Sequence, residues 1–283
     1  MPPPNPSRSS SRRGVRKPRP RVKVVPYVVP TKRRAPERAA PLTVPTRWVK
    51  NLVAIFLLPW AAILTETFFS AFARAAFHQR LWAGAEFWFF SLGALLWLIA
   101  FVGLPRPVLV YVFGHELTHA LWVWLMGGRV SKFRVGSEGG HIITNRTNFW
   151  IALAPYFFPI YSVLAIILYG IATLFVNVAP FGQLLFATIG ITWAFHFSFT
   201  LWMIPKNQSD LRDHGTFFSL VFIYLMNVAL LSFLLILASP QITFASFGAD
   251  LLKNLRSFAE WAGGVMNQFQ HGHDTTPIDL PGS

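Results

Sequence analysis

The feature that most constrains the fold is a series of long apolar runs between Trp48 and Ala238. Six of them have about 18 to 28 residues, enough for a helix to cross a hydrocarbon core of about 30 Å. The candidate spans are residues 49–72, 87–104, 108–126, 149–176, 181–204 and 216–238. We therefore expect an all-α, multi-pass integral membrane protein with about six transmembrane helices in residues 48–240.

Two interruptions of this pattern predict local structure. The fourth run contains Pro155 and Pro159, and proline lacks the backbone N–H that a helix needs, so we expect a kink or an unwound turn there. After the third run, Gly127 and Gly128 end the helix, and two short β-prone stretches follow in residues 129–147. These stretches predict a small β-hairpin at the membrane edge.

The C-terminal part of the chain changes character. Apolar residues recur every three or four positions between Phe244 and Phe269, as on one face of an amphipathic helix. We expect such a helix in residues 241–270, lying in the membrane interface with Lys253 and Arg256 outward, although it could equally pack back on the bundle. Residues 271–283 are expected to form a flexible tail.

The net charge of +14 is concentrated at the N-terminus. Residues 1–50 hold fourteen Lys and Arg and one acid, Glu37. The first 47 residues are rich in Pro, Arg and Ser and have no hydrophobic period, which predicts a disordered basic tail. Beside a first membrane span, such a tail favours anionic lipid headgroups, and nucleic acid is a less suitable partner.

The expected orientation of the chain is contradictory. The basic tail favours a cytoplasmic N-terminus, and three crossings would then put the loop after the third run outside. That loop carries Arg129, Lys132, Arg134 and Arg146, which the positive-inside tendency would place in the cytoplasm. One run could be re-entrant, so the orientation stays open.

The third run contains the sequence VFGHELTHALWVW, with His115, Glu116 and His119. The two histidines are one helical turn apart, so both rings can reach one metal ion, while Glu116 is turned by about 100° and can take a proton from a water. A chance HExxH is expected in fewer than about 1% of chains of this composition. Burying ionisable side chains at membrane depth costs free energy, which favours a functional role for these three residues. The alternative is that they only hydrogen-bond to one another, or line a polar gap between helices.

A third ligand is expected, because catalytic zinc sites use three protein ligands. The chain has no cysteine, so the ligand must be a histidine or an acid. The candidates in apolar or membrane-edge settings are Asp210, Asp213, His196, His214, His141 and Glu66.

The arrangement resembles the site-2-type intramembrane zinc metalloproteases. Their second motif reads roughly Asn-x-x-Pro-x-x-x-x-Asp-Gly, and here Pro205 and Asp210 have its spacing, while Trp202 and Leu211 replace the Asn and the Gly. The resemblance covers about residues 107–215. It implies a helical core around Zn²⁺, a hairpin beside the substrate strand, and Asp210 as the third ligand, which His196, Asp213 or His214 could replace.

From these observations we expect an intramembrane zinc metallopeptidase that hydrolyses membrane-spanning protein substrates. Glu116 would be the general base, and His115, His119 and Asp210 would hold Zn²⁺. The alternatives are a catalytically inactive metal-binding membrane protein or transporter, and an interaction protein whose basic tail recruits partners. The substrate, the membrane and the oligomeric state are open.

Overall fold

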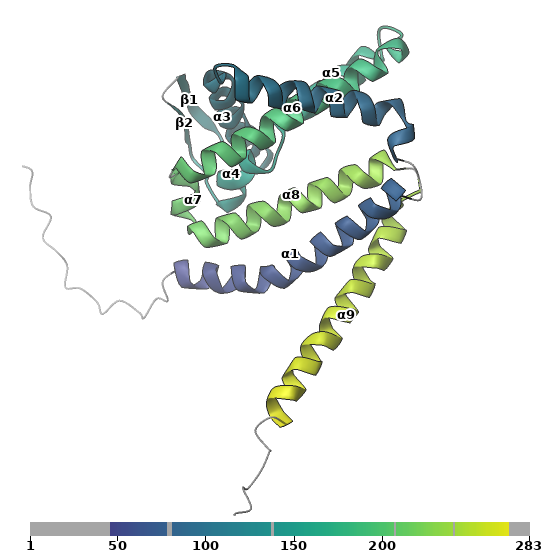
Figure 1. Cartoon of the computed structure of the whole chain (residues 1–283). Helices are drawn as coiled ribbons and strands as arrows, with labels where there is room; N and C mark the ends of the chain where they lie inside the picture. The colour runs from purple at the N-terminus through teal and green to yellow at the C-terminus, as the bar shows by residue number, and fades with distance from the viewer. Residues whose placement is uncertain (1–45, 78–80, 137–138, 207, 240, 272–283) are drawn as a thin grey trace, which may run out of the picture. The chain divides into compact units, whose positions relative to one another are not determined.

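The computed structural model describes residues 46–77, 81–136, 139–206, 208–239 and 241–271, and in these ranges it is mostly helical with one two-stranded antiparallel sheet (Figure 1). Residues 1–45 of the predicted basic tail and residues 272–283 of the predicted C-terminal tail lie outside the described residues.

The elements follow one another as a series of helices interrupted once by the sheet. The α-helices and strands are α1 (Thr46–Phe77), α2 (Ala85–Gly103), α3 (Val108–Leu125), β1 (Val130–Gly136), β2 (Gly139–Thr144), α4 (Phe149–Leu153), α5 (Ile160–Ala172), α6 (Gly182–Met203), α7 (Ser209–Asp213), α8 (Thr216–Ala238) and α9 (Phe244–His271). Short 3₁₀ turns are η1 (Leu81–Ala83), η2 (Ala154–Tyr156), η3 (Ala179–Phe181) and η4 (Ile204–Lys206).

Five of the helices are long and apolar enough to cross a membrane: α1, α2, α3, α8 and the segment Ala179–Lys206 around α6. The segments Phe149–Tyr156 and Ile160–Ala172 would count as a sixth span if taken together. They are bent by 81° at a break that contains Pro159, where the missing proline N–H predicts a kink. Length and composition thus suggest a membrane protein, and the count of six spans stays a prediction.

Large apolar side chains cover the outer faces of these helices. Val102 of α2 is 83% exposed, and exposed tryptophans, phenylalanines and leucines continue along α1, α2 and α8. A water-soluble monomer rarely exposes so much contiguous apolar surface. Lipid is the environment in which these faces would be satisfied.

The long helices pack in pairs that run side by side (Figure 1): α1 lies along α8, and α2 lies along α6. The α2–α6 contact is close because Gly93 faces Ala187 and Gly190 faces Phe90, where a Cβ would meet a backbone carbonyl. Small residues at helix contacts are typical of membrane bundles.

The helix α5 runs antiparallel to α6. A hydrogen bond of 2.9 Å between Ser162 and Thr192 links the two helices.

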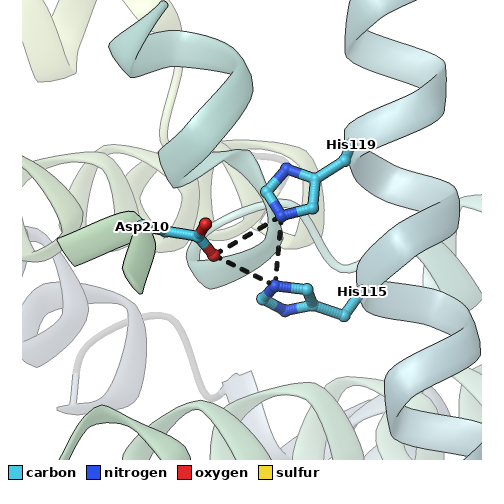
Figure 2. Close-up of side chains that lie close together, drawn as sticks. All are labelled: His115, His119 and Asp210. Atoms are coloured by element: carbon cyan, nitrogen blue, oxygen red, sulfur yellow. Dashed lines mark hydrogen bonds and ion pairs between the residues drawn. The ribbon is translucent and has the colours of Figure 1, made fainter. Parts of the chain in front are cut away.

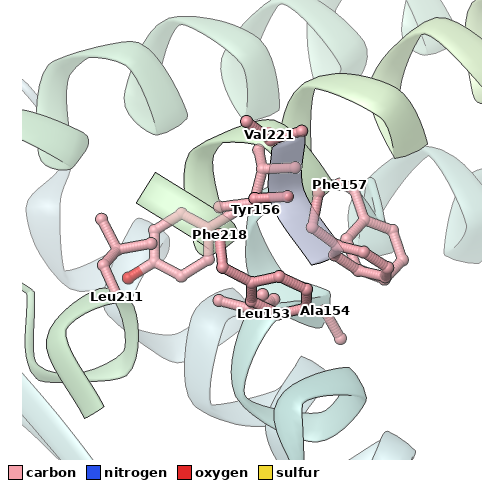
Figure 3. Packing of buried hydrophobic residues seen from close by; sticks show 10 residues of the cluster. Leu153, Ala154, Tyr156, Phe157, Leu211, Phe218 and Val221 are labelled. Carbon is pink, nitrogen blue, oxygen red and sulfur yellow. The ribbon is translucent and has the colours of Figure 1, made fainter. Parts of the chain in front are cut away.

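The main buried cluster joins the centre of the chain to its second half (Figure 3). Its members come from α1, α4, η2 with the residue after it, α7 and α8, and include Ala54, Tyr156, Phe157, Leu211 and Phe218. Because Tyr156 and Leu211 belong to this cluster, the turn before α5 and the short helix α7 are fixed against α8.

The predicted hairpin is the β1–β2 sheet, which packs against α3. Lys132 pairs with Ile143 and Arg134 with His141, and the register shifts between Val130 and Lys132. The turn residues Ser137 and Glu138 lie outside the described residues.

The amphipathic helix is α9, and its first half packs on α1. Phe247 is buried with Ala71 of α1, Asn254 donates a hydrogen bond to Thr67, and Arg74 pairs with Asp250. Lys253 and Arg256 are exposed, as expected. Packing on the bundle therefore accounts for the first half of the helix, and its location in the membrane interface stays a prediction.

Candidate metal centre

His115, His119 and Asp210 come together in space although 91 positions separate the second histidine from the acid (Figure 2). The two Nε2 atoms lie 3.1 Å apart, and Asp210 Oδ2 lies 3.3 Å from Nε2 of His115 and 3.5 Å from Nε2 of His119. The histidines face the same way because both project from α3 one turn apart.

Asp210 reaches the histidines because the chain turns sharply after α6. Pro205 lies in the 3₁₀ turn η4, and α7 follows with Asp210 in its first turn. Leu211 is buried in the main cluster, and its carbonyl accepts a hydrogen bond of 3.1 Å from the Ser219 hydroxyl. This anchoring of the next residue holds the Asp210 carboxylate toward α3.

Each of the three groups has a further hydrogen-bond partner outside the cluster. Nδ1 of His119 donates to the Ile151 carbonyl at 2.8 Å, the Tyr111 hydroxyl lies 3.2 Å from Nδ1 of His115, and the Tyr156 hydroxyl donates to Asp210 Oδ2 at 3.2 Å. A carbonyl can only accept, so Nδ1 of His119 carries the proton and Nε2 presents a lone pair to the cluster. Such partners commonly orient metal ligands.

The carboxyl of Asp210 is ionised in this setting. Burial alone raises the pKa of the Asp210 carboxyl, but the His115 and His119 rings, when they are protonated and donate to it, outweigh burial and hold the pKa below its ordinary value. At neutral pH the group is therefore a carboxylate, the form that binds a cation.

The donor set fits one metal ion. Tetrahedral ligands at about 2.0 to 2.2 Å from zinc lie about 3.3 Å from one another, and the three distances between His115, His119 and Asp210 are 3.1 to 3.5 Å. A cation between them would also relieve the repulsion between two close nitrogen lone pairs. Among the described residues, this is the group of histidines and acids that could hold a metal ion.

Glu116 is buried on the same helix and borders a cavity of about 340 Å³ beside the three residues. The strand β2 forms another wall, through Gly139, Gly140 and Ile142. A Cβ at Gly140 would lie 2.6 Å from Cγ of Glu116 and 2.9 Å from its Oε1. The absence of a side chain at Gly140 therefore leaves the space that the glutamate occupies.

The other candidate ligands from the sequence lie elsewhere. Asp213 is exposed at the end of α7, and Glu66 is exposed on α1. His214 accepts a hydrogen bond of 2.9 Å from the Lys50 ammonium, and burial and this neighbouring charge lower the pKa of His214. The structure does not bring these three residues into the cluster.

Two histidines lie near the cluster without joining it. His141 of β2 borders the large cavity. His196 of α6 borders a second cavity of about 20 Å³ that also touches His115, and its Nε2 is buried with no hydrogen-bond partner among the described residues. Asp210 is thus the acid that lies beside both histidines of the motif.

Three residues of the site were not singled out from the sequence: Tyr111, Gly140 and Tyr156. Tyr111 stands four positions before His115, so its place on the same helix face was a usable signal. Gly140 and Tyr156 reach the site through tertiary contacts, for which the local sequence has no spacing signal.

No protein-family model matches this chain, and the searches of curated proteins and of solved structures found no significant match either. The resemblance to site-2-type proteases therefore rests on the motif residues and their geometry.

Proposed function

We propose that the protein is an intramembrane zinc metallopeptidase of the site-2 type. The observation that carries this proposal is the position of Asp210, whose Oδ2 lies within 3.3 and 3.5 Å of Nε2 of His115 and His119. The sequence alone left several candidates for the third ligand. In the proposal His115, His119 and Asp210 hold the metal and Glu116 is the general base.

The chemistry is addition of water across a peptide bond. A bound Zn²⁺ supplies Lewis-acid activation of the water and of the peptide carbonyl. The Glu116 carboxylate accepts the proton from the attacking water and then donates it to the amine nitrogen as the C–N bond breaks. Burial of Glu116 supports this role, because a desolvated carboxylate is a stronger base than a solvated one.

The cavity supports a peptide substrate in an extended form. A helical segment hides its carbonyls in internal hydrogen bonds, so a membrane-spanning substrate must unwind before it is cut. One edge of β2 pairs with β1, while Gly139, Gly140 and Ile142 of β2 line the cavity next to Glu116. An unwound substrate strand placed along β2 would present its carbonyls to the catalytic residues.

The test is cleavage of membrane-spanning reporters by the purified, zinc-loaded protein. Glu116→Gln should abolish cleavage, because an amide cannot accept the proton, and it should retain the metal, because Glu116 is not a ligand. The matched control is Glu86→Gln at the start of α2, which should cleave at the wild-type rate. Cleavage by Glu116→Gln at the rate of the control would refute the proposed mechanism.

A second candidate function is metal binding without proteolysis, in an inactive peptidase or a transporter. It is favoured by the two departures from the family motif, Trp202 and Leu211. Leu211 is buried in the main cluster, and the Trp202 ring lies under the cations of Arg106 and Lys206. Wild-type protein that holds metal but cleaves no reporter would favour this candidate.

A further inference from the structure

The contacts between helices define which segments lie at the same end of the bundle. α1 and α8 run in the same direction, because Lys50 contacts His214 near their beginnings and Thr65 contacts Tyr224 further along. α6 ends where α8 begins, since only residues 204–215 separate them. We call this end of the bundle, where Lys50, α7 and His214 lie, the site end.

The helix α2 also finishes at the site end. Trp97 donates a hydrogen bond to Ser198 in the second half of α6, and the Arg106 guanidinium, just after α2, lies 5.0 Å from the centre of the Trp202 ring. Trp202 is the last residue but one of α6. The linker from α2 to α3 therefore lies beside the end of α6.

Both ends of α3 lie at the site end as well. At its beginning, the Tyr111 ring stacks on Phe199 near the end of α6, with centroids 4.7 Å apart. At its end, the Trp122 ring stacks on Trp150 of α4. The neighbouring Phe149 contacts Phe218 in the first turn of α8 (ring centroids 5.6 Å apart). α3 thus leads from the end of α6 to the beginning of α8, and it packs mainly on the sheet, α4 and η2.

These contacts conflict with a membrane crossing by α3. If α3, the α4–α5 segment and α6 each crossed once, Arg106 and Trp202 would be separated by three crossings. They would then lie on opposite faces, about 30 Å apart. The contact between Lys50 and His214 leads to the same result, because five crossings would separate that pair. Each contact requires an even number of membrane crossings between its two residues. If α3 does not cross the membrane, both numbers become even.

We propose that the chain crosses the membrane five times, through α1, α2, the bent α4–α5 segment, α6 and α8, while α3 and the sheet stay on the cytoplasmic side. α5 has only 13 residues, and α4 and η2 lead into it at 81°, so the chain turns within the membrane's depth. The exposed apolar residues of α3, Leu109, Phe113 and Leu125, then lie in the cytoplasmic leaflet.

The distribution of charge supports the cytoplasmic assignment. Among the described residues, the site end carries eight cations outside the tail against three acids, Glu116, Asp210 and Asp213. The cations are Lys50, Arg106, Arg129, Lys132, Arg134, Arg146, Lys206 and Arg212. Residues 1–47, which lead into α1 in the sequence, hold thirteen Lys and Arg, whereas residues 173–181, between α5 and α6, have no charge. The tail and the loop after α3 thus share one side, in agreement with the positive-inside rule. The inference is independent of catalysis.

The test uses single-cysteine variants, which need no other change because the chain has no cysteine. Ser10→Cys reports the tail, Ser131→Cys the sheet, Asn177→Cys the α5–α6 connection and Ser257→Cys the helix α9. Each variant is produced in a bacterial host whose only membrane is the plasma membrane. A membrane-impermeant maleimide is applied to intact cells and to permeabilised cells, and all four variants should react in the permeabilised cells. We expect Asn177→Cys and Ser257→Cys to react in intact cells, and Ser10→Cys and Ser131→Cys only after permeabilisation.

The opposite patterns would overturn the inference. Six crossings would put Ser131→Cys on the side opposite Ser10→Cys, and Ser257→Cys on the same side as Ser10→Cys. Reaction of Ser10→Cys in intact cells would overturn the cytoplasmic assignment. As a second measurement, a short bis-maleimide that bridges two thiols should link Lys50→Cys to His214→Cys, and it should not link Lys50→Cys to Lys253→Cys. Failure of the first pair to cross-link would remove the contact on which the argument rests.

Discussion

The hydrogen bond from His119 to the Ile151 carbonyl decides what the other ring nitrogen can do. Because Nδ1 carries the proton, Nε2 faces His115 and Asp210 as a lone pair. Tyr156 also orients a ligand, because its hydroxyl donates a hydrogen bond to the Asp210 oxygen that faces the two rings. At the scale of single residues, neighbouring groups therefore orient the histidine nitrogens and the carboxylate so that they could bind a cation.

Tyr156→Phe tests whether this orientation of the Asp210 carboxylate supports metal binding. The substitution keeps the ring in the main cluster and removes only the donor to Asp210, so we expect metal affinity to fall about 10- to 100-fold. Competition with a zinc chelator measures the affinity. The matched control is Tyr169→Phe, whose hydroxyl donates to the distant Val178 carbonyl. Equal affinities of the two variants would mean that Tyr156 does not support the site.

Gly140→Ala tests the packing of the general base. A Cβ at this position would lie 2.6 Å from Cγ of Glu116, so the carboxylate must shift. A displacement of about 1 Å in a catalytic group can cost about 100-fold in rate, and we expect a loss of that order with metal content unchanged. Gly170→Ala, where a Cβ would meet nothing within 4 Å, is the control. Full activity of Gly140→Ala would contradict this account of the strand.

At the scale of elements, the close contact of α2 with α6 holds the end of α6 from which the chain turns to Asp210. Gly190→Val would force a side chain against the backbone carbonyl of Phe90. Overpacking of this kind costs about 1 to 3 kcal/mol, so the melting temperature in detergent should fall. Gly170→Val, with open space around it, should melt at the wild-type temperature. A Gly190→Val protein as stable as this control would mean that the two helices can separate without loss.

The sequence predicted the bounds of the helices better than it predicted which of them cross the membrane. The run 216–238 coincides with α8, and 108–126 with α3 plus one residue, because length and apolar composition define both. Composition cannot distinguish a crossing helix from one whose two ends lie on the same side of the membrane, as we propose for α3. Pro155 and Pro159 predicted a break before α5, but its angle of 81° depends on the packing of η2 in the main cluster.

The site was predictable to the extent that its residues share one helix. Helical spacing brings His115, Glu116 and His119 together, and the motif spacing after Pro205 selected Asp210 from several candidates. The contact of Asp210 with α3 depends on the turn through η4 and α7, which the local sequence does not specify. For the same reason the contribution of Tyr156 could not be predicted.

At the scale of the whole molecule, the topology and the proposed activity together fix where substrates are cut. If α3 and the sheet lie at the cytoplasmic side, the cavity beside Glu116 opens toward that leaflet. We expect cleavage in the cytoplasmic half of a reporter's membrane span, mapped by mass spectrometry of the products. Moving the helix-breaking residues of a reporter to the outer half should abolish cleavage, and efficient cleavage there would contradict this placement.

The central claim is that two separate segments of the chain form one metal site, and the metal content of purified protein tests it most directly. By inductively coupled plasma mass spectrometry, we expect about one zinc per chain in the wild type, in Glu116→Gln and in the control Asp213→Ala. Asp210→Ala should lose most of this metal, since two histidines remain without the carboxylate. Absence of metal from the wild type, or an Asp210→Ala protein that holds as much as Asp213→Ala, would contradict the account.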